Sequence, residues 1–343
     1  MINRADYAHT IYPPVAQILF WMTTFISPTI ACMKTVMVLF EGVTLWSILK
    51  LLRYLGRPRE QAILYVWCPL LIWEIAGSGH LDAAAMAFIG LALVFRYRRR
   101  PVLTGIFLAL AVLTKLYPLV LFPALYLRKP ALDRAGNRRS FLQTFDWTMP
   151  AVMLALAIPA YALYSSVGRM VFGFLGGYVQ EEGMTTGTRY FLLEQAQHLP
   201  GLHDLPPNAY IAFAALALTA LALWAFRISS ADRSLFTPYL RNQPTAFLKP
   251  AFALAAALML LFSPHYPWYV AWLIPFLALL PNLPMLAYIL GLFYLCTTAL
   301  AVGAGPKQSL LNQILYGGVA LATLLHLALR RWLPYRALCS PQA

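Results

Sequence analysis

Long apolar segments recur along the whole chain and constrain its fold more than any other feature. Each is about 15–23 residues long, close to the roughly 20 apolar residues that carry an α-helix across a bilayer. Of the 343 residues, 61% are hydrophobic and 11% are charged, whereas a soluble domain carries about 25% charged residues. We therefore predict an all-α polytopic membrane protein with about 10–11 transmembrane or re-entrant helices and an outer interfacial helix.

The basic residues indicate the orientation of the chain. Most Lys and Arg residues lie in alternate loops, at 50–59, 96–100, 128–139, 227–249 and 330–336. Such loops face the cytoplasm in membrane proteins, so the net charge of +14 reflects orientation, and no nucleic-acid partner is expected. The four cysteines show no disulfide or metal spacing. The polar N-terminus lacks the apolar core of a cleavable signal peptide.

This orientation predicts one integral membrane domain over residues 1–343. Its loops are too short to bury a core of their own. Within 102–128, Pro118 disfavours a helical conformation at Tyr117, which predicts two short helices that meet at the outer side. The expected parts are an outer loop with an interfacial helix (1–28), N-terminal helices (29–164, including 60–76 and 81–96), an outer loop (165–206) and C-terminal helices (207–343).

The same orientation gathers ionisable residues at the outer side. These are Asp6, His9, Glu74, His80, Asp82, Lys115, Arg169, Glu181, Glu182, Arg189 and His265. Ionisable groups at membrane depth cost about 2.5–3.5 kcal/mol each on insertion scales and usually line a cavity. A polar site that opens to the outer leaflet is therefore expected.

The stretch "WEIAGSGHLDAA" interrupts two apolar runs with two carboxylates and an imidazole. Asp82 begins the second helix, where an acid either complements the helix dipole or faces the outer cavity. Glu74 lies near the end of the first helix, where an acid is unfavourable to the dipole, so a functional role is favoured for it. His80 and Asp82 alone are too few ligands for a metal site.

Two further stretches place polar groups at the outer side. Lys115 in "TKLYP" either extends to the lipid headgroups or contacts a phosphate, since a lysine inside an apolar segment is a functional candidate. The segment "SPHYPWYVAW" holds His265 between two prolines. Its aromatic residues fit an interfacial belt, and His265 is equally a candidate phosphate contact.

The outer loop and the N-terminus add weaker candidates. The default interpretation of "YVQEEGMTTGTRYF" is a solvated loop, but the guanidinium of Arg189 is suited to an anion. Asp6 and His9 precede a Pro-Pro entry to the interfacial helix.

Four of these stretches together resemble a known family. "HTIYPPVAQ", "CPLLIWEIAGSGHLDA", "TKLYPLVLFP" and "SPHYPWYVAWLIPFL", in this order, are similar to bacterial GT-C membrane glycosyltransferases, in particular family 87 and related polyprenol-phosphate-mannose-dependent mannosyltransferases. The resemblance implies a GT-C-like fold in the bacterial inner membrane. It also implies inverting transfer of a sugar, mannose, from a polyprenyl-phosphate donor to a lipid or glycan acceptor at the extracytoplasmic face. Relatives begin further upstream, so an N-terminally shortened chain is expected, with Asp6 the nearest carboxylate in its first loop.

Sugar transfer from a phosphate needs one base and a stabilised leaving group. The phosphate leaves as an anion without a protonated acid, so one carboxylate suffices to take the acceptor's proton, and cationic groups stabilise the phosphate. The catalytic candidates are Asp82, Asp6, Glu74 and His80, and the donor-phosphate candidates are Lys115, Arg189 and His265. The expected cavity residues are His9, Tyr12, Tyr117, Glu181, Tyr266 and Trp268. No cofactor is identified with certainty, a divalent metal is left open, and membrane lipids are expected partners.

Two other functions remain open at this stage. A transporter or flippase of lipid-linked sugars would distribute polar residues to both membrane sides and often contain an inverted repeat. An inactive scaffold paralogue would form complexes without transferring a sugar.

Overall fold

The computed structural model describes residues 9–129, 137, 139, 140, 142–230, 246–297 and 306–332. Over this part of the chain every regular element is a helix, which confirms the predicted all-α class. Three segments are long and apolar enough to cross a membrane, Ile30–Tyr54, Pro207–Ile228 and Ser309–Leu329. A bent pair of helices makes a fourth, and six further apolar helices are shorter. The chain is therefore a polytopic membrane protein.

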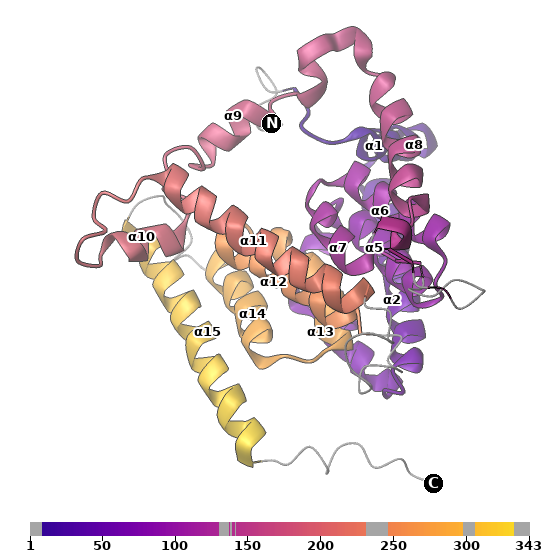
Figure 1. The fold of residues 1–343 in the computed structure, drawn as a ribbon. Helices are drawn as coiled ribbons and strands as arrows, with labels where there is room; N and C mark the ends of the chain where they lie inside the picture. The colour runs from indigo at the N-terminus through magenta and orange to yellow at the C-terminus, as the bar shows by residue number, and fades with distance from the viewer. Residues whose placement is uncertain are drawn as a thin grey trace.

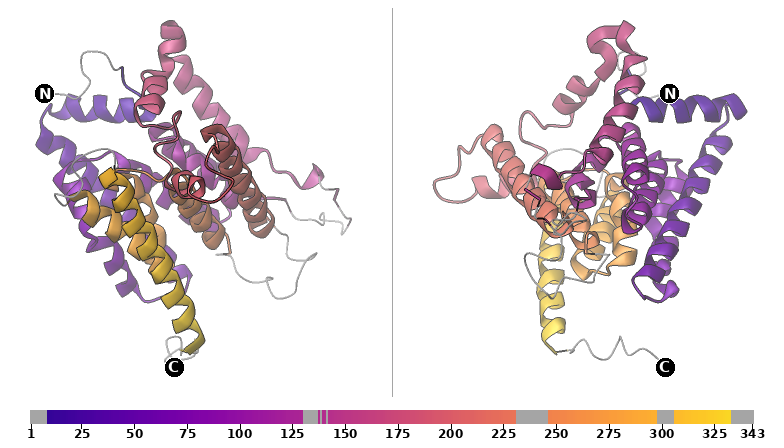
Figure 2. Two further views of the ribbon diagram at one scale, coloured as in Figure 1. Left: turned by 90° about the vertical axis from the view of Figure 1, so that its left-hand side faces the viewer. Right: turned by 45° about the vertical axis from the view of Figure 1, so that its right-hand side comes forward.

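The first described helix lies crosswise to the second. Helix α1 (Pro14–Ile26) is followed by α2 (Ile30–Tyr54), which runs away from it towards the opposite end of the molecule (Figure 2). The hydroxyl of Thr29 accepts a hydrogen bond from Cys32 N and so caps α2, which satisfies one of the free amides at a helix start. This geometry agrees with the interfacial helix expected at 15–26.

The helix expected over 60–76 is not continuous. Pro69 lacks an N–H group and cannot continue a helix, so the chain divides at Cys68. The elements are η1 (Arg59–Ala62), α3 (Ile63–Val66), α4 (Pro69–Leu71), the π-helix η2 (Ile72–Gly77) and, after a bend of 118°, α5 (Asp82–Tyr97). The long α5 is buried along most of its length and packs against α2.

Separate short helices lie within 102–128 as expected, but the break falls at Lys115, whereas Tyr117, where Pro118 was expected to disfavour a helix, begins the next helical segment. Helix α6 ends at Thr114, and Lys115 adopts an extended conformation before a new helical segment begins. Helix α6 packs between α5 and α8. The elements here are α6 (Pro101–Thr114), η3 (Tyr117–Leu121), α7 (Phe122–Leu125), η4 (Leu142–Thr144) and α8 (Thr148–Ala162).

The predicted outer loop 165–206 is partly helical. It contains η5 (Ser165–Phe172), α9 (Leu175–Glu181) and α10 (Phe191–Gln197). The N-terminal segment lies directly against it: Phe174 N donates to His9 O at 3.2 Å. A Cβ on Gly173 would stand 1.8 Å from Thr10 O, so this close approach requires a glycine.

The C-terminal helices pack beside the first group (Figure 1). They are α11 (Pro207–Ser230), α12 (Leu248–Phe262), η7 (Pro267–Leu273), α13 (Ile274–Leu279), α14 (Leu283–Thr297) and α15 (Pro306–Trp332). Helix α13 contacts α2 and α3, so one apolar core joins the two groups. Helix α12 ends in Ser263 with a left-handed backbone (φ 44°), which turns the chain directly into the segment Pro264–Pro267.

Candidate active site

Glu74 and His80 form a pair across the bend between η2 and α5. Glu74 Oε2 lies 3.1 Å from His80 Nε2. The π-helical turn places Glu74 in the interior, where it is 4% exposed, and His80 is half-buried in the turn that follows. The backbone closes the same loop, because His80 N donates to Glu74 O at 3.1 Å. A carboxylate beside an imidazole fixes the ring orientation and favours a proton on the facing nitrogen.

Asp82 and Lys115 form a second pair, whose carboxylate is fully enclosed and whose ammonium is partly buried. Lys115 Nζ lies 2.6 Å from Asp82 Oδ2, and the Tyr117 hydroxyl donates to Oδ1 at 3.2 Å. Asp82 is 0% exposed. Both carboxylate oxygens therefore have a partner, which a buried charge needs in order to be tolerated.

A third ion pair lies in the segment between α9 and α10. Arg189 Nη1 lies 2.6 Å from Glu182 Oε2, and both side chains are buried. Arg189 Nε also donates to Phe262 O at 3.2 Å. The pair thus attaches this segment to the end of α12, where a loop without buried partners was expected from the sequence.

Tyr269 on η7 connects the second and third pairs. Its ring centre lies 5.6 Å from Lys115 Nζ and 5.9 Å from Arg189 Cζ, within the range of cation–π attraction. Its hydroxyl is hydrogen-bonded to that of Tyr178 on α9. The helix break, the lysine turn and the α9–α10 segment therefore meet at one place.

Three aromatic rings stack beside the Glu74–His80 pair. The rings of Tyr266 and Trp268 lie 4.5 Å apart at 7°, and those of Trp268 and His80 lie 4.4 Å apart at 17°. Tyr266 is 40% exposed, so the stack leads from the protein surface to the imidazole. The sequence placed Tyr266 and Trp268 in the substrate cavity, and the structure stacks Trp268 on His80 and Tyr266 on Trp268.

His265 lies beside the third pair with one unpaired nitrogen. Its Nε2 is buried and has no hydrogen-bond partner among the described residues. Burial lowers the pKa of His265, and the neighbouring charge of Arg189 lowers it further. The neutral imidazole is therefore favoured, so His265 acts as a hydrogen-bonding group rather than as a cation.

The remaining candidates lie apart from these contacts or outside the described residues. Asp6 belongs to the part of the chain that is not described. His9 is exposed, and Tyr12 packs edge-on against Phe20 at 5.4 Å. Glu181 is exposed, whereas its neighbour Glu182 is the buried acid. Sequence reasoning placed Glu182 at the outer side but did not select it as a site residue, and it did not select Tyr178 or Tyr269 either.

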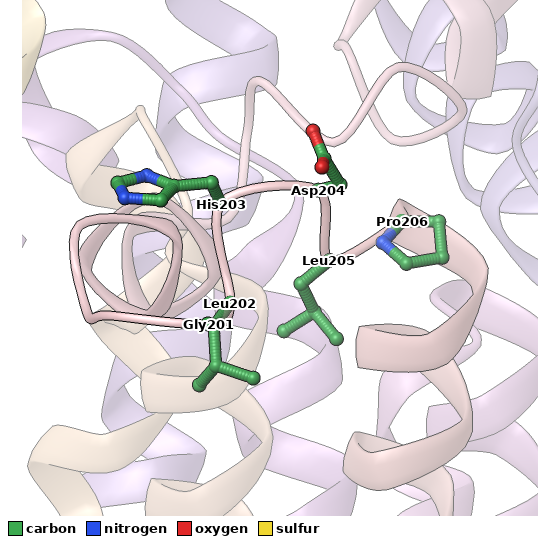
Figure 3. A pocket seen from close by; sticks show the side chains of 6 residues that line it. All are labelled: Gly201, Leu202, His203, Asp204, Leu205 and Pro206. Atoms are coloured by element: carbon green, nitrogen blue, oxygen red, sulfur yellow. The ribbon is translucent and has the colours of Figure 1, made fainter.

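A hollow in the loop before α11 contains none of the residues of the three ion pairs. It is lined by the consecutive residues Gly201–Pro206, and the side chains of His203 and Asp204 diverge from Leu205 rather than converge on one point (Figure 3). All of its walls come from a single loop. It therefore lacks the convergent polar groups of a binding site.

The described residues contain no group of three or more His, Cys, Asp or Glu side chains that could hold a metal ion.

Comparison with known proteins points to mannosyl transfer. Residues 7–129 match the MptA/B family, described as alpha-(1->6)-mannopyranosyltransferase, N-terminal domain. The match covers a little over a third of the chain and includes Glu74, His80, Asp82 and Lys115. No curated protein and no solved structure matches the chain. The similarity to GT-C-like mannosyltransferases is confirmed, and the placement in family 87 stays a prediction.

Proposed function

We propose that this protein transfers mannose from a polyprenyl-phosphate donor to a hydroxyl of a lipid or glycan acceptor, with inversion, at the outer face of the membrane. The proposal rests on the family match and on the ion pairs that lie within the matched segment. The mannosyltransferase match covers residues 7–129, and this segment supplies the Glu74–His80 and Asp82–Lys115 pairs.

His80, oriented by Glu74, is the proposed proton acceptor. Its Nε2 faces Glu74, which leaves Nδ1 for the substrate. The acceptor oxygen attacks C1 of the mannose, its proton passes to Nδ1, and the C1–oxygen bond breaks with its electron pair retained by the phosphate. A single displacement of this kind inverts the anomeric centre. General-base catalysis contributes about 10²–10⁴-fold to such a step.

Lys115 is the proposed electrostatic partner of the leaving phosphate, and Asp82 is its positioning residue. Asp82 is enclosed and both of its oxygens are engaged, so we assign it to holding the ammonium rather than to accepting the proton. An ammonium carries three donors, of which Asp82 occupies one. Asp6 stays an alternative base, predicted from the sequence alone.

The remaining groups bind and enclose the substrate in this proposal. The unpaired Nε2 of His265 offers a neutral hydrogen bond to a sugar or phosphate oxygen. The Glu182–Arg189 pair holds the α9–α10 segment over the cluster and so excludes water, which strengthens electrostatic interactions within it.

The test is transfer from radiolabelled polyprenyl-phosphate-mannose by the purified protein in lipid nanodiscs. We expect transfer by the native chain and a loss of about 10²–10⁴-fold in His80→Gln. His203→Gln, in the hollow away from the cluster, is the matched control and should retain full activity. Absence of transfer by the native chain, or equal rates for His80→Gln and His203→Gln, would refute the proposal.

The membrane side is tested separately by cysteine labelling in a cysteine-free background. Ser78 is exposed next to the Glu74–His80 pair, and Arg59 is exposed on the loop after α2. A membrane-impermeant maleimide added to intact cells should label Ser78→Cys and not Arg59→Cys. The reverse pattern would place the cluster on the cytoplasmic side.

A further inference from the structure

The cations of the cluster are already paired with carboxylates. Lys115 has Asp82 and Arg189 has Glu182, each at 2.6 Å, and His80 has Glu74 at 3.1 Å. These pairs carry little net positive charge. Lys115 keeps free donors for the leaving phosphate, but Asp82 neutralises part of its charge. A further cation without a carboxylate partner would therefore strengthen phosphate binding at this site.

Lys34 on α2 is this cation. It is half-buried and makes no hydrogen bond or ion pair with any residue that the structure describes. Its side chain passes directly over the bend next to His80, because a Cβ built on Gly79 would lie 3.2 Å from Lys34 Cγ and 3.8 Å from its Cα. Gly79 also has a φ of +78°. The positive φ favours glycine at residue 79, and its missing side chain lets the lysine stem lie close along the bend.

The surroundings of Lys34 indicate a ligand with an apolar part. Ile30 and Val38 lie one helical turn before and after it on α2 and are 76% and 45% exposed. Helix α2 packs against the π-helix η2, on which Trp73 is also exposed. In a membrane protein an unpaired cation within an exposed apolar strip suits an anionic lipid, whose headgroup meets the cation and whose chain meets the strip.

We propose that Lys34 binds the phosphate of the polyprenyl lipid and seats it at the rim of the Glu74–His80 pair. This inference rests on the proposed function for the identity of the lipid. When the C1–oxygen bond of the donor breaks, the phosphate oxygen retains the bonding electrons and its negative charge increases. Lys34 stabilises this charge, while Lys115, held by Asp82, lies deeper in the cluster.

Binding of a short lipid phosphate tests the inference without relying on catalysis. The probe is farnesyl phosphate, titrated into the purified protein in nanodiscs and followed by calorimetry, with farnesol as the uncharged counterpart. A hydrogen bond to a charged group contributes about 1.5–3 kcal/mol, so Lys34→Gln should weaken farnesyl phosphate binding about tenfold or more. Farnesol binding should stay unchanged, and Lys34→Arg should restore most of the affinity.

Lys50→Gln is the matched control, since Lys50 lies on the same helix with its Nζ 5.8 Å from the Trp46 ring centre. It should bind farnesyl phosphate like the native protein. Equal affinity in Lys34→Gln and the native protein, or an equal loss in Lys50→Gln, would overturn the inference. Competition by inorganic phosphate at the concentration of the lipid would also overturn it, because a soluble phosphate would then be the ligand.

The two proposals fail in different ways. If the native chain binds farnesyl phosphate through Lys34 but transfers no mannose, the proposed function is wrong and this inference stands. If the chain transfers mannose and Lys34→Gln leaves the KM for the lipid donor unchanged, this inference is wrong and the proposed function stands. The melting temperatures of Lys34→Gln and Lys34→Arg are compared with that of the native protein. This comparison shows whether a loss of farnesyl phosphate binding reflects unfolding of the variant.

Discussion

Lys115 Nζ lies 2.6 Å from Asp82 Oδ2, although 33 residues separate them along the chain. The contact joins the start of α5 to the end of α6 at the same end of the helix bundle. Because Asp82 is completely enclosed, neither charge can be left alone without a large free-energy cost.

Breaking the Asp82–Lys115 pair should destabilise the protein. Asp82→Ala leaves an uncompensated ammonium, and the expected loss is about 3–5 kcal/mol. The double variant Asp82→Leu with Lys115→Met removes both charges and should recover much of the stability, while sugar transfer stays lost. Thermal unfolding in detergent measures this, with the exposed Glu60→Gln as control. A double variant no more stable than Asp82→Ala would show that the charges are not coupled.

The Glu182–Arg189 pair should hold the α9–α10 segment in place. Arg189→Met removes both the ion pair and the bond to Phe262 O, so we expect about 3–5 kcal/mol of local destabilisation and faster cleavage within 178–190 by limited proteolysis. Glu181→Gln, at an exposed neighbouring position, should be cleaved at the native rate. Unchanged proteolysis of Arg189→Met would mean that the pair does not fix this segment.

The Trp268 ring should position the imidazole of His80. In Trp268→Leu the stacked surface is lost, and a displacement of about 1 Å at a reacting group can cost about 10² in rate. Trp268→Phe keeps a ring and should lose much less. The kcat for mannose transfer distinguishes the two, since a purely structural role would lower the amount of folded protein rather than the kcat. Equal kcat values in both variants would exclude a positioning role.

Protonation of His265 should reduce stability at acidic pH. Because burial and Arg189 lower the pKa of His265 from its ordinary value of 6.5, the unfolded chain takes up the proton first. The free energy of unfolding is therefore unaffected by His265 above about pH 6.5, and it decreases as the pH falls below that value. Melting temperatures from pH 8 to pH 5 should decline more steeply for the native protein than for His265→Gln. Parallel declines would show that His265 does not titrate in this way.

The helices could be predicted because their signals are local. The apolar run expected as a helix over 81–96 is observed as α5, Asp82–Tyr97. A break within 102–128 was predicted from Pro118, but it falls at Lys115, three residues earlier, because Tyr117 is accommodated in a 3-10 helix.

The partners within the site could not be predicted from the sequence. Contact between Glu182 and Arg189 depends on the turn between α9 and α10, and both helices are too short to show a periodic pattern. Lys34 lies within an apolar helix, where its single charge does not interrupt the run. Lys34 becomes a candidate phosphate contact only because it lies beside Gly79. That position follows from the tertiary packing of α2 against the bend.

The π-helical turn at Ile72–Gly77 has a consequence for engineering this protein. Glu74 and His80 stand six positions apart, and in a regular α-helix such residues lie about 9 Å apart along the axis and on different faces. Their contact exists only because the helix widens and then stops. A helix-favouring replacement of Gly79 would be strained by its φ of +78°, so it would destabilise the bend and separate Glu74 from His80. A programme of thermal improvement would do best to leave this stretch untouched.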